Sequence, residues 1–486
     1  MIEEIGHLLA QYWPHMVLLL SLVASVATAI HAAMTKQDVR AAIGWVSVVI
    51  LSPLLGATFY LFAGINRVRR ERVTQQRLLA EQDRASIERL ELRHLDDEFD
   101  EHIRPLRRLG DEVSSNALLR GNLIELLSGG DQTYPAMLAA ISQAKSSVAL
   151  QSYIFDHDGI GVRIAQALID AQQRGVAVRV LIDAVGAKYS RPPITQMLEE
   201  ARIPVGRFLP TAIGLRLVYA NMRSHRKLLV TDGQYALTGG MNIREGFTRE
   251  FGGDDMAVDT HFKVRGPVAR HLVESFAHDW EFTTGERLEG EAWFPSLEVV
   301  AEESGVPARV VLSGPDRALG RNQSMLLGAL SVARRHVRIQ SPYFLPEPVL
   351  IGGLVTAARR GVRVEVVIPA NNNLKLVSAA MEAQLDLLLH GGVHVWRATG
   401  AFDHSKLMTV DDQWCYVGSS NVDPRSQRLN FELDLEVYDR KLAHQIASCI
   451  DGKISQARRA TLAELANRPF WKRLRNRFIW LASPLL

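Results

Sequence analysis

One segment occurs twice in this chain, and that repeat restricts the fold more than any other feature. SVALQSYIF begins at Ser147 and precedes IGVRIAQALIDAQQRGVAVRVLID, while HVRIQSPYF begins at His336 and precedes VLIGGLVTAARRGVRVEVVIPA. Each copy reads as a β-branched strand, an amphipathic helix, an Arg-Gly break and a second apolar strand, which is the pattern of a βαβ unit. The repeat therefore predicts an α/β fold with helices on the faces of a sheet.

Each copy continues into further strand-like runs and closes with VDTHFKVRG or FELDLEVYD before a helix. We expect two similar tandem domains, residues 117–295 and 296–466. Duplication would place corresponding residues on opposite sides of a pseudo-twofold interface, where ligand clefts commonly form. Two half-sites can then make one site.

A short motif lies in each copy, with a histidine, lysine, aspartate, glycine and asparagine at the same intervals. The residues are His225, Lys227, Asp232, Gly239 and Asn242 in the first copy and His404, Lys406, Asp411, Gly418 and Asn421 in the second. A single His-x-Lys is a weak signal. The same five residues at the same spacing in two otherwise divergent repeats indicate a shared chemical role.

The residue types suit attack on a phosphodiester. Positions i and i+2 of a strand share a face, so each histidine points the same way as its lysine. Two lysines and the amides of Asn242 and Asn421 would hold the anionic oxygens. A neutral imidazole can attack phosphorus, and a protonated one can donate to the leaving alkoxide. This scheme requires no metal, and we expect no cofactor.

These motifs resemble the signature of the phospholipase D superfamily, which is His-x-Lys, four residues, Asp, six residues, then Gly-Gly or Gly-Ser. Both copies match it throughout, and the resemblance implies a covalent phosphohistidine at the domain interface. The N-terminal segment and the second motif tail, GSSNVDPRSQRLNFE, are similar to the bacterial cardiolipin synthases of that superfamily. The first copy departs from that pattern at Gly246, where an aromatic is usual, and in lacking a tryptophan near Val258.

The resemblance also implies a carboxylate behind each histidine, fixing its tautomer as an aspartate does in a serine-protease triad. Glu432 fits this role for His404. Alignment of the two closing strands indicates Asp259 for His225, and the alternatives are Glu245, Asp254 and Asp255. The motif residues Asp232 and Asp411 are grouped with the catalytic set, but we expect them to support its strands and loops rather than touch phosphate.

Two uncharged stretches precede the repeats. Residues 16–34 and 41–65 lack Asp, Glu, Lys and Arg, and each approaches the roughly 20 residues that cross a bilayer. They predict a two-helix transmembrane hairpin within residues 1–66. A cleaved signal peptide fits poorly, because Glu3 and Glu4 stand where a basic segment belongs. The arginines that follow the second stretch predict cytoplasmic catalytic domains. The resemblance implies a multi-pass protein of the bacterial inner membrane.

Two further segments are charged. Residues 67–116 predict a helical connector, because Gly and Pro are absent from Arg67 to Ile103. Residues 467–486 interleave basic and aromatic side chains, as in helices that lie on anionic membranes. A terminal helix packed on its own domain is an equally good interpretation of this second segment.

The charge and the cysteine content argue against several classes of protein. A net charge of +3 over 486 residues indicates no global field for nucleic acid, and nucleic acid is not an expected partner. Only Cys415 and Cys449 are present, outside any CxxC pattern, so we expect neither a disulfide framework nor a thiolate zinc site. Phospholipids, phosphatidylglycerol first, and an anionic membrane are the expected partners.

Three functions compete. The first is transfer of a phosphatidyl group between two phosphatidylglycerol molecules, giving cardiolipin and glycerol, with another donor or alcohol as a close variant. The second is hydrolysis by a phospholipase D or a nuclease with the same motifs. The third is an inactive membrane scaffold, which the two complete motif sets oppose.

Overall fold

The computed structural model describes residues 2–36, 39–61, 99–210, 222–296, 305–316, 318–481 and 483. It divides into two compact units, Met1–Arg69 and Arg70–Leu486. Most of the predicted connector lies outside the described residues, and only its end, from Phe99, can be compared with the structure.

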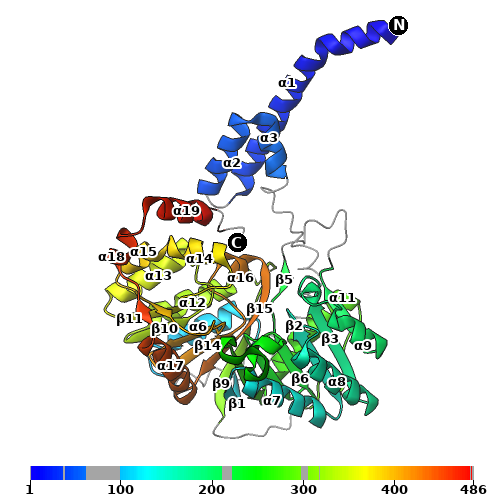
Figure 1. Cartoon of the computed structure of the whole chain (residues 1–486), viewed down its shortest axis with the longest axis vertical. Helices are drawn as coiled ribbons and strands as arrows, with labels where there is room; N and C mark the ends of the chain where they lie inside the picture. Colours follow the sequence, from blue (N-terminus) through cyan, green and yellow to red (C-terminus); the bar gives the residue numbers. More distant parts are fainter. Residues whose placement is uncertain are drawn as a thin grey trace. The chain divides into compact units, whose positions relative to one another are not determined.

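The first unit contains three helices, α1 (Ile2–Thr35), α2 (Val39–Leu51) and α3 (Pro53–Phe59) (Figure 1). Within the described residues, Tyr12–Thr35 is the one helical stretch long and apolar enough to cross a membrane. The second predicted span, of which residues 62–65 lie outside the described part of the chain, is not one continuous helix. It breaks at Ser52, whose backbone leaves the helical region directly before Pro53. Proline removes a backbone donor and restricts the residue before it, which accounts for the break.

The second unit is built on one mixed sheet. Its strands run in the order β16-β12-β11-β10-β13-β14-β15-β9-β1-β8-β7-β6-β2-β3-β4, and β5 pairs with β15 outside this path. Outward from the antiparallel β9–β1 pair, the order is equivalent on both sides, with β8, β7, β6, β2, β3 and β4 matched by β15, β14, β13, β10, β11 and β12. The fold is thus mixed α/β with two similar regions, as the repeat predicts.

The strands of the first region are β1 (Leu119–Ser128), β2 (Ser147–Ser152), β3 (Ala177–Asp183), β4 (Val205–Phe208), β5 (Arg223–Ser224), β6 (Leu228–Thr231), β7 (Tyr235–Gly239) and β8 (Thr260–Arg265). Those of the second are β9 (Val306–Ser313), β10 (His336–Gln340), β11 (Arg363–Pro369), β12 (His394–Ala398), β13 (Leu407–Val410), β14 (Trp414–Gly418), β15 (Asn430–Tyr438) and β16 (Arg458–Arg459).

The helices of the first region are α7 (Gly130–Gln143), α8 (Gly159–Gln173), α9 (Ile194–Glu200), α10 (Arg249–Gly252) and α11 (Val268–Thr284). Those that follow are α12 (Arg321–Val332), α13 (Pro348–Arg359), α14 (Lys375–Glu382), α15 (Leu385–His390), α16 (Pro424–Arg428), α17 (Arg440–Ser455), α18 (Leu462–Ala466) and α19 (Phe470–Leu481). The predicted βαβ units are β2–α8–β3 and β10–α13–β11, and the strands of each pair run parallel.

Each region has its own apolar core. One cluster gathers β2, β3, α7 and α8 around Ile164 and Val180, and the other gathers β10, β11, α12 and α13 around Leu354 and Val366. Helix α6 (Arg104–Val113), at the end of the predicted connector, inserts Leu106 into the second cluster. The connector therefore ends as part of the catalytic unit. The predicted boundary between residues 295 and 296 stays a prediction.

Candidate active site

Both motif histidines lie where a strand of one region meets the other region. Directly before His225, β5 pairs with the start of β15, and the His225 amide donates to Phe431 O at 2.9 Å. In the same way, the His404 amide donates to Val258 O at 2.7 Å, next to a bridge between Val258 and Asp403. Each histidine is therefore anchored by the backbone of the opposite region.

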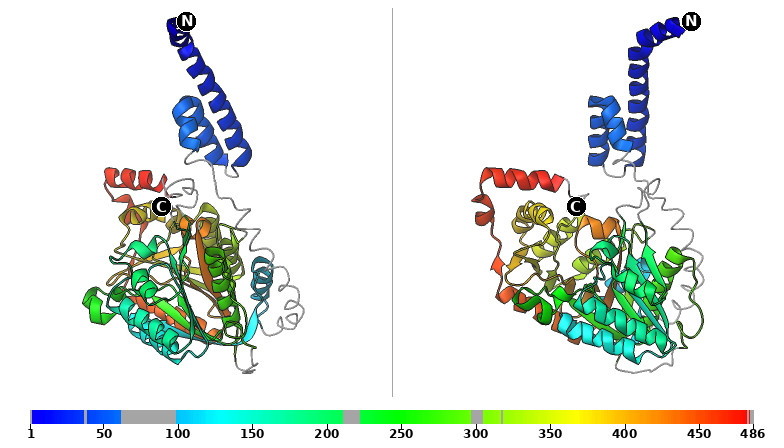
Figure 2. Two further views of the ribbon diagram at one scale, coloured as in Figure 1. Left: turned by 90° about the vertical axis from the view of Figure 1, so that its right-hand side faces the viewer. Right: turned by 45° about the vertical axis from the view of Figure 1, so that its right-hand side comes forward.

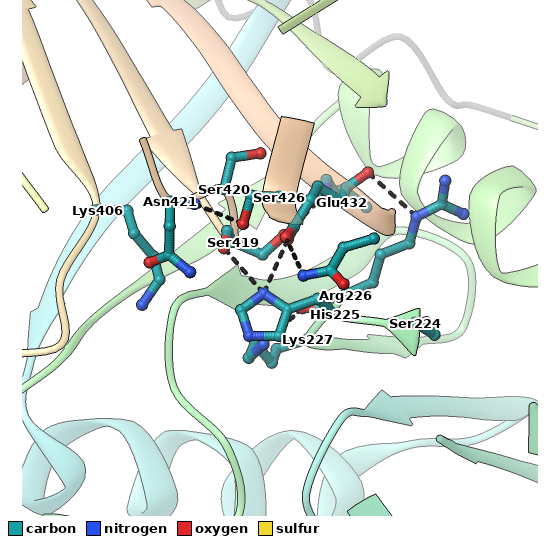
Figure 3. Close-up of polar contacts among 12 residues, drawn as sticks. Ser224, His225, Arg226, Lys227, Lys406, Ser419, Ser420, Asn421, Ser426 and Glu432 are labelled. Carbon is teal, nitrogen blue, oxygen red and sulfur yellow. Dashed lines mark hydrogen bonds and ion pairs between the residues drawn. The ribbon is translucent and has the colours of Figure 1, made fainter. Parts of the chain in front are cut away.

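The carboxylates are paired across the same boundary. His225 Nδ1 lies 2.9 Å from Glu432 Oε2 and 3.1 Å from Ser419 O, contacts that Figure 3 shows converging on the imidazole. His404 Nδ1 lies 2.7 Å from Asp259 Oδ2. Asp259 and Glu432 are fully buried, so water does not compete for these bonds. Each bond leaves Nε2 of its histidine as the reactive nitrogen.

The expected pairing of Glu432 with His404 and Asp259 with His225 is therefore wrong, although both carboxylates belong to the site. Alignment of the closing strands identifies equivalent residues, but it cannot reveal that each histidine strand leaves its own region. The other carboxylates considered as partners of His225 have different surroundings. Glu245 accepts a bond from the Gly159 amide, and Asp254 and Asp255 are exposed.

The two motifs form one electrostatic site. Burial lowers the pKa of His225 well below its usual value, and the charges of Lys227 and Lys406 lower it further. Burial also lowers the pKa of His404 to about 4, and both lysines again contribute. Because each lysine acts on both imidazoles, the motif copies lie within electrostatic reach of each other. Both histidines are neutral near pH 7.

The two lysines are buried. Lys227 Nζ donates to His225 O at 2.5 Å, and Lys406 Nζ donates to His404 O and lies 2.8 Å from His404 Nδ1. Burial lowers the pKa of Lys227 to about 7, against the opposing charge of Glu432. It also lowers the pKa of Lys406, with Asp259 opposing the shift. A buried ammonium group has lost its hydrating water, so an anionic ligand that restores contacts to its charge is favoured.

The motif asparagines are buried beside the same strands. Asn242 Oδ1 accepts from the Ile154 amide at 3.2 Å, which fixes its side chain. Among the described residues, Asn421 Oδ1 has no hydrogen-bond partner, although it is buried. Figure 3 places Asn421 beside Lys406, near His225. A role for both amides in holding phosphate stays a prediction.

The glycines of the motif make room for the carboxylates. A Cβ at Gly240 would collide with the Asp259 carboxylate. In the second copy the corresponding residue is Ser419, whose hydroxyl donates to Glu432 Oε2 at 2.6 Å. The Gly-Gly and Gly-Ser endings therefore have different uses, one admitting a carboxylate and the other donating to it.

The motif aspartates cap strands rather than face the histidines. Asp232 accepts from the amides of Lys145, Ser146 and Ser147, with distances from 2.7 to 3.1 Å. Asp411 accepts equivalent bonds from Arg334, Arg335 and His336, and its Oδ2 also lies 3.1 Å from His102 Nε2. Both adopt positive φ angles, 51° and 54°, in the turn after the motif strand. This agrees with the expected supporting role.

Aromatic residues around the histidines were not among the predicted site residues. The Tyr153 ring centroid lies 5.3 Å from that of His225. His404 has three such neighbours, Tyr343 and Phe402 at 6.0 Å and Phe247 at 6.5 Å. Tyr153 and Tyr343 belong to the SYIF and SPYF segments of the repeat, but at positions offset by one residue, so aligning the copies does not pair them.

A family model described as "Cardiolipin synthase, PLD-like domain" matches residues 137–280 and 326–453, which together hold both motifs. The crystal structure of phosphatidylserine synthase from Haemophilus influenzae Rd KW20 superposes with a TM-score of 0.61 at 16% identity, covering 80% of this chain and 100% of that one. At that identity the likeness concerns the fold alone. Fold and site thus define the chain as a phospholipase D-like protein.

Comparison with the sequences of known proteins identifies the family within the phospholipase D-like class. Cardiolipin synthase from Alkalihalophilus pseudofirmus is 30% identical over 452 residues, 91% of this chain and 88% of that protein. Cardiolipin synthase A from Yersinia pseudotuberculosis serotype O:3 is 31% identical over 460 residues, 93% of this chain and 94% of that protein. The chain belongs to the cardiolipin synthase family.

Proposed function

We propose that this protein transfers the phosphatidyl group of one phosphatidylglycerol to a hydroxyl of a second, giving cardiolipin and glycerol. The proposal rests on the pair of motif histidines. Each is hydrogen-bonded to a carboxylate from the other region, and the charges of both lysines lower the pKa of each imidazole. Such a site holds a phosphodiester between two bases, and the family relationship supports phospholipids as its substrates.

The first half-reaction forms a phosphohistidine. Neutral His225 attacks phosphorus through Nε2, and an N–P bond forms as the P–O bond to glycerol breaks. Protonated His404 gives its proton to the departing glycerol oxygen. The bound anion favours protonation of His404, and Asp259 stabilises the resulting imidazolium. Burial acts to raise the pKa of Asp259, but the Lys406 charge and the His404 contact outweigh it and lower the pKa, so this carboxylate stays ionised.

The second half-reaction returns the enzyme to its starting state. Neutral His404 removes the proton from a hydroxyl of the second phosphatidylglycerol, and that oxygen attacks phosphorus as the N–P bond breaks. We assign His225 as the nucleophile and His404 as the acid and base, and the lowered pKa of Asp259, which keeps this carboxylate ionised behind His404, supports the assignment. Throughout, Lys227 and Lys406 neutralise the non-bridging oxygens.

Membrane attachment fits this substrate. The apolar helix Tyr12–Thr35 supports anchoring, and the bacterial relatives support the inner membrane as its location. The arginines from Arg67 to Arg72 support a cytoplasmic position for the catalytic regions, arranged as a pseudo-twofold pair. The prediction that the chain crosses the membrane twice is not supported in the same way, because the second apolar segment folds as two short helices.

Helix α19 supports an additional contact with anionic lipid. One face packs on the second region through Ile479 and Trp480, and Arg477 pairs with Asp386 at 2.6 Å. The other face leaves Phe470, Trp471, Phe478 and Leu481 exposed by 64–75%. The packing supports the interpretation as a terminal helix on its own domain, and the exposed aromatic face flanked by basic residues supports contact with an anionic membrane.

Purified protein in liposomes with labelled phosphatidylglycerol tests the proposal. We expect cardiolipin and glycerol in equal amounts, and no sustained turnover to either product by the His225→Ala or His404→Ala variant. Phosphatidic acid without cardiolipin would identify a hydrolase instead. Phosphatidylethanolamine added as a second labelled donor would show whether phosphatidylglycerol is the preferred one. Absence of turnover with either lipid would contradict the proposal.

A further inference from the structure

The two apolar segments of the first unit differ in how far they extend. At 1.5 Å per residue, the 24 residues Tyr12–Thr35 span about 36 Å, enough for a hydrocarbon layer of about 30 Å. The 13 residues of α2 span about 20 Å, and α3 has only seven residues. Neither short helix can cross a bilayer by itself.

The chain reverses direction between α2 and α3. In a continuous helix, Trp45 and Tyr60 would be about 22 Å apart along the axis, yet their ring centroids are 5.2 Å apart. Closer to the break, a Cβ at Gly56 would lie 2.5 Å from Val48 O. Both contacts join residues on opposite sides of Ser52, so α3 returns alongside α2.

The return brings the end of α3 back to the end of α1. Tyr60 OH lies 2.8 Å from His31 Nδ1, near the C-terminal end of α1. Lys36 Nζ, just after that helix, lies 5.8 Å from the centre of the Tyr60 ring. The chain thus leaves the helical pair beside the point at which it entered.

The helical pair covers only part of α1, as both views of Figure 2 show. From Tyr12 onward, where burial along α1 is described, the buried positions are Ser25, Thr28 and Ala32, exposed by 8% or less. Nearer the N-terminus, Tyr12, Trp13, Met16, Leu18, Leu19 and Leu20 are exposed by 54–69%. The pair therefore reaches only partway along the length of α1 that would cross the bilayer.

The reversal is compatible with a lipid environment. Gly56 and Ala57 on α3 are buried, and Gly56 packs against the α2 backbone at Val48 and Val49, the kind of close helix packing common in membranes. At the break, the Ser52 amide donates to Val48 O and the Gly56 amide to Ser52 O, while Pro53 has no donor. The outward residues of the pair, among them Ile50, Leu51, Leu55 and Phe59, are apolar and exposed by 64–84%.

We propose that α1 crosses the membrane once and that α2 and α3 form a re-entrant helical pair, which enters the bilayer from the cytoplasmic face and returns to it. The N-terminal end of α1 and the catalytic unit then lie on opposite sides. This topology fits the preference of basic residues for the cytoplasmic side of a membrane. That side would hold all the basic residues near the two segments, namely Lys36, Arg40, Arg67, Arg69, Arg70 and Arg72, whereas Glu3 and Glu4 would lie on the other side. In a two-span hairpin, Lys36 and Arg40 would face outward.

This inference rests on the membrane anchoring proposed above, and labelling of single cysteines with a membrane-impermeant maleimide tests it. Cys449 is naturally exposed and reports the side of the catalytic unit, whereas Cys415 is buried. Glu3→Cys and Thr35→Cys, each combined with Cys449→Ser, report the two ends of α1. Leu51→Cys in the same background reports the tip of α2, where the native side chain is 84% exposed.

In intact spheroplasts we expect strong labelling of Glu3→Cys alone. Thr35→Cys and the native Cys449 should react only after the membrane is permeabilised. Leu51→Cys should resist labelling in both states and react only after denaturation in detergent, which also confirms that the reagent and protein are competent. Cardiolipin formation by each variant in detergent serves as a control for folding.

Labelling of Thr35→Cys from outside, with Glu3→Cys protected, would establish the two-span hairpin and overturn the proposal. Protection of both residues in spheroplasts and exposure of both on permeabilisation would show that α1 does not cross. Reaction of Leu51→Cys in intact spheroplasts would also overturn it, because the tip of α2 would then reach the outer face. Release of the protein by alkaline carbonate would instead contradict the anchoring itself, whatever the catalytic activity.

Discussion

The two copies of the motif have the same residues at the same spacing, yet they provide different support to the histidines. The first region contributes Asp259, a short carboxylate that fits against Gly240 and contacts only one motif histidine, His404. The second region contributes Glu432, a longer carboxylate that accepts hydrogen bonds from the side chains of Ser419 and Asn430 and contacts His225. The pKa of Asp259 is lowered and that of Glu432 is raised, the latter by burial. Duplication has therefore produced two half-sites that differ in their capacity to stabilise a positive charge.

Replacing the histidines should have the largest effect and should separate their roles. We expect His225→Ala and His404→Ala each to reduce kcat by on the order of 10⁴-fold or more, because the groups act as a unit. After mixing with phosphatidylglycerol and quenching in a neutral denaturant, since acid cleaves the N–P bond, a phosphatidyl-histidine peptide should be recovered from His404→Ala but not from His225→Ala. The reverse pattern would exchange the nucleophile and acid assignments.

Removing the charge of the carboxylates should sharpen the difference between the half-sites. We expect Asp259→Asn to reduce kcat by roughly 10³-fold, since a carboxylate behind a catalytic imidazole contributes on this order. Glu432→Gln should cost less, because His225 Nδ1 also lies 3.1 Å from Ser419 O, which can still orient the ring.

The crossed pairing can be tested by NMR titration of the histidine rings. Asp259→Asn should shift the titration of His404 and leave that of His225 close to the wild type, whereas Glu432→Gln should do the opposite. If each substitution instead affected the histidine of its own region, the pairing across the regions would be contradicted.

Exchanging the small residues of the motif should have an intermediate and unequal effect. Gly240→Ser adds a Cβ against the Asp259 carboxylate, so we expect kcat to fall by about 10²-fold and the melting temperature to drop. Ser419→Ala removes one hydrogen bond to Glu432 and should cost about 1 kcal/mol, or roughly five- to tenfold in rate. Equal effects would mean that the two endings are interchangeable.

The smallest effect concerns pH. With the pKa of Lys227 lowered to about 7, this lysine is charged below that pH and loses its charge above it. Affinity for an anionic lipid should therefore be greatest below pH 7, and KM should rise as pH increases beyond it. Lys227→Arg keeps its charge throughout and should flatten the rise. An unchanged KM profile in this variant would assign the pH dependence to another group.

The comparison of the two regions also shows what could be predicted from the sequence. The repeat predicts the α/β fold, and the motif with its aligned closing strands identifies His225, His404, Asp259 and Glu432. Their pairing could not be predicted, because it depends on contacts between strands about 145 and 207 positions apart. Local patterns contain no information about which region such a strand will join.

The second apolar segment illustrates a different limit. Its length and lack of charge predict a membrane span, and those properties do not distinguish a straight helix from one that reverses. Pro53 and Gly56 were the available signals. They are tolerated in spanning helices as well, so the reversal is revealed by the contacts across the break, Trp45 with Tyr60 and Gly56 with Val48.

The crossed carboxylates make the two regions mutually dependent. Neither region holds a complete acid–base pair, so an ancestor with a single copy could have worked only as a dimer, each subunit completing the other. Fusion into one chain fixes the ratio of the partners and holds them at high effective concentration. It also frees each copy to change independently, because a substitution in one region no longer appears twice in the same site. The short and long carboxylates are the kind of divergence that an obligate symmetric dimer could not have acquired.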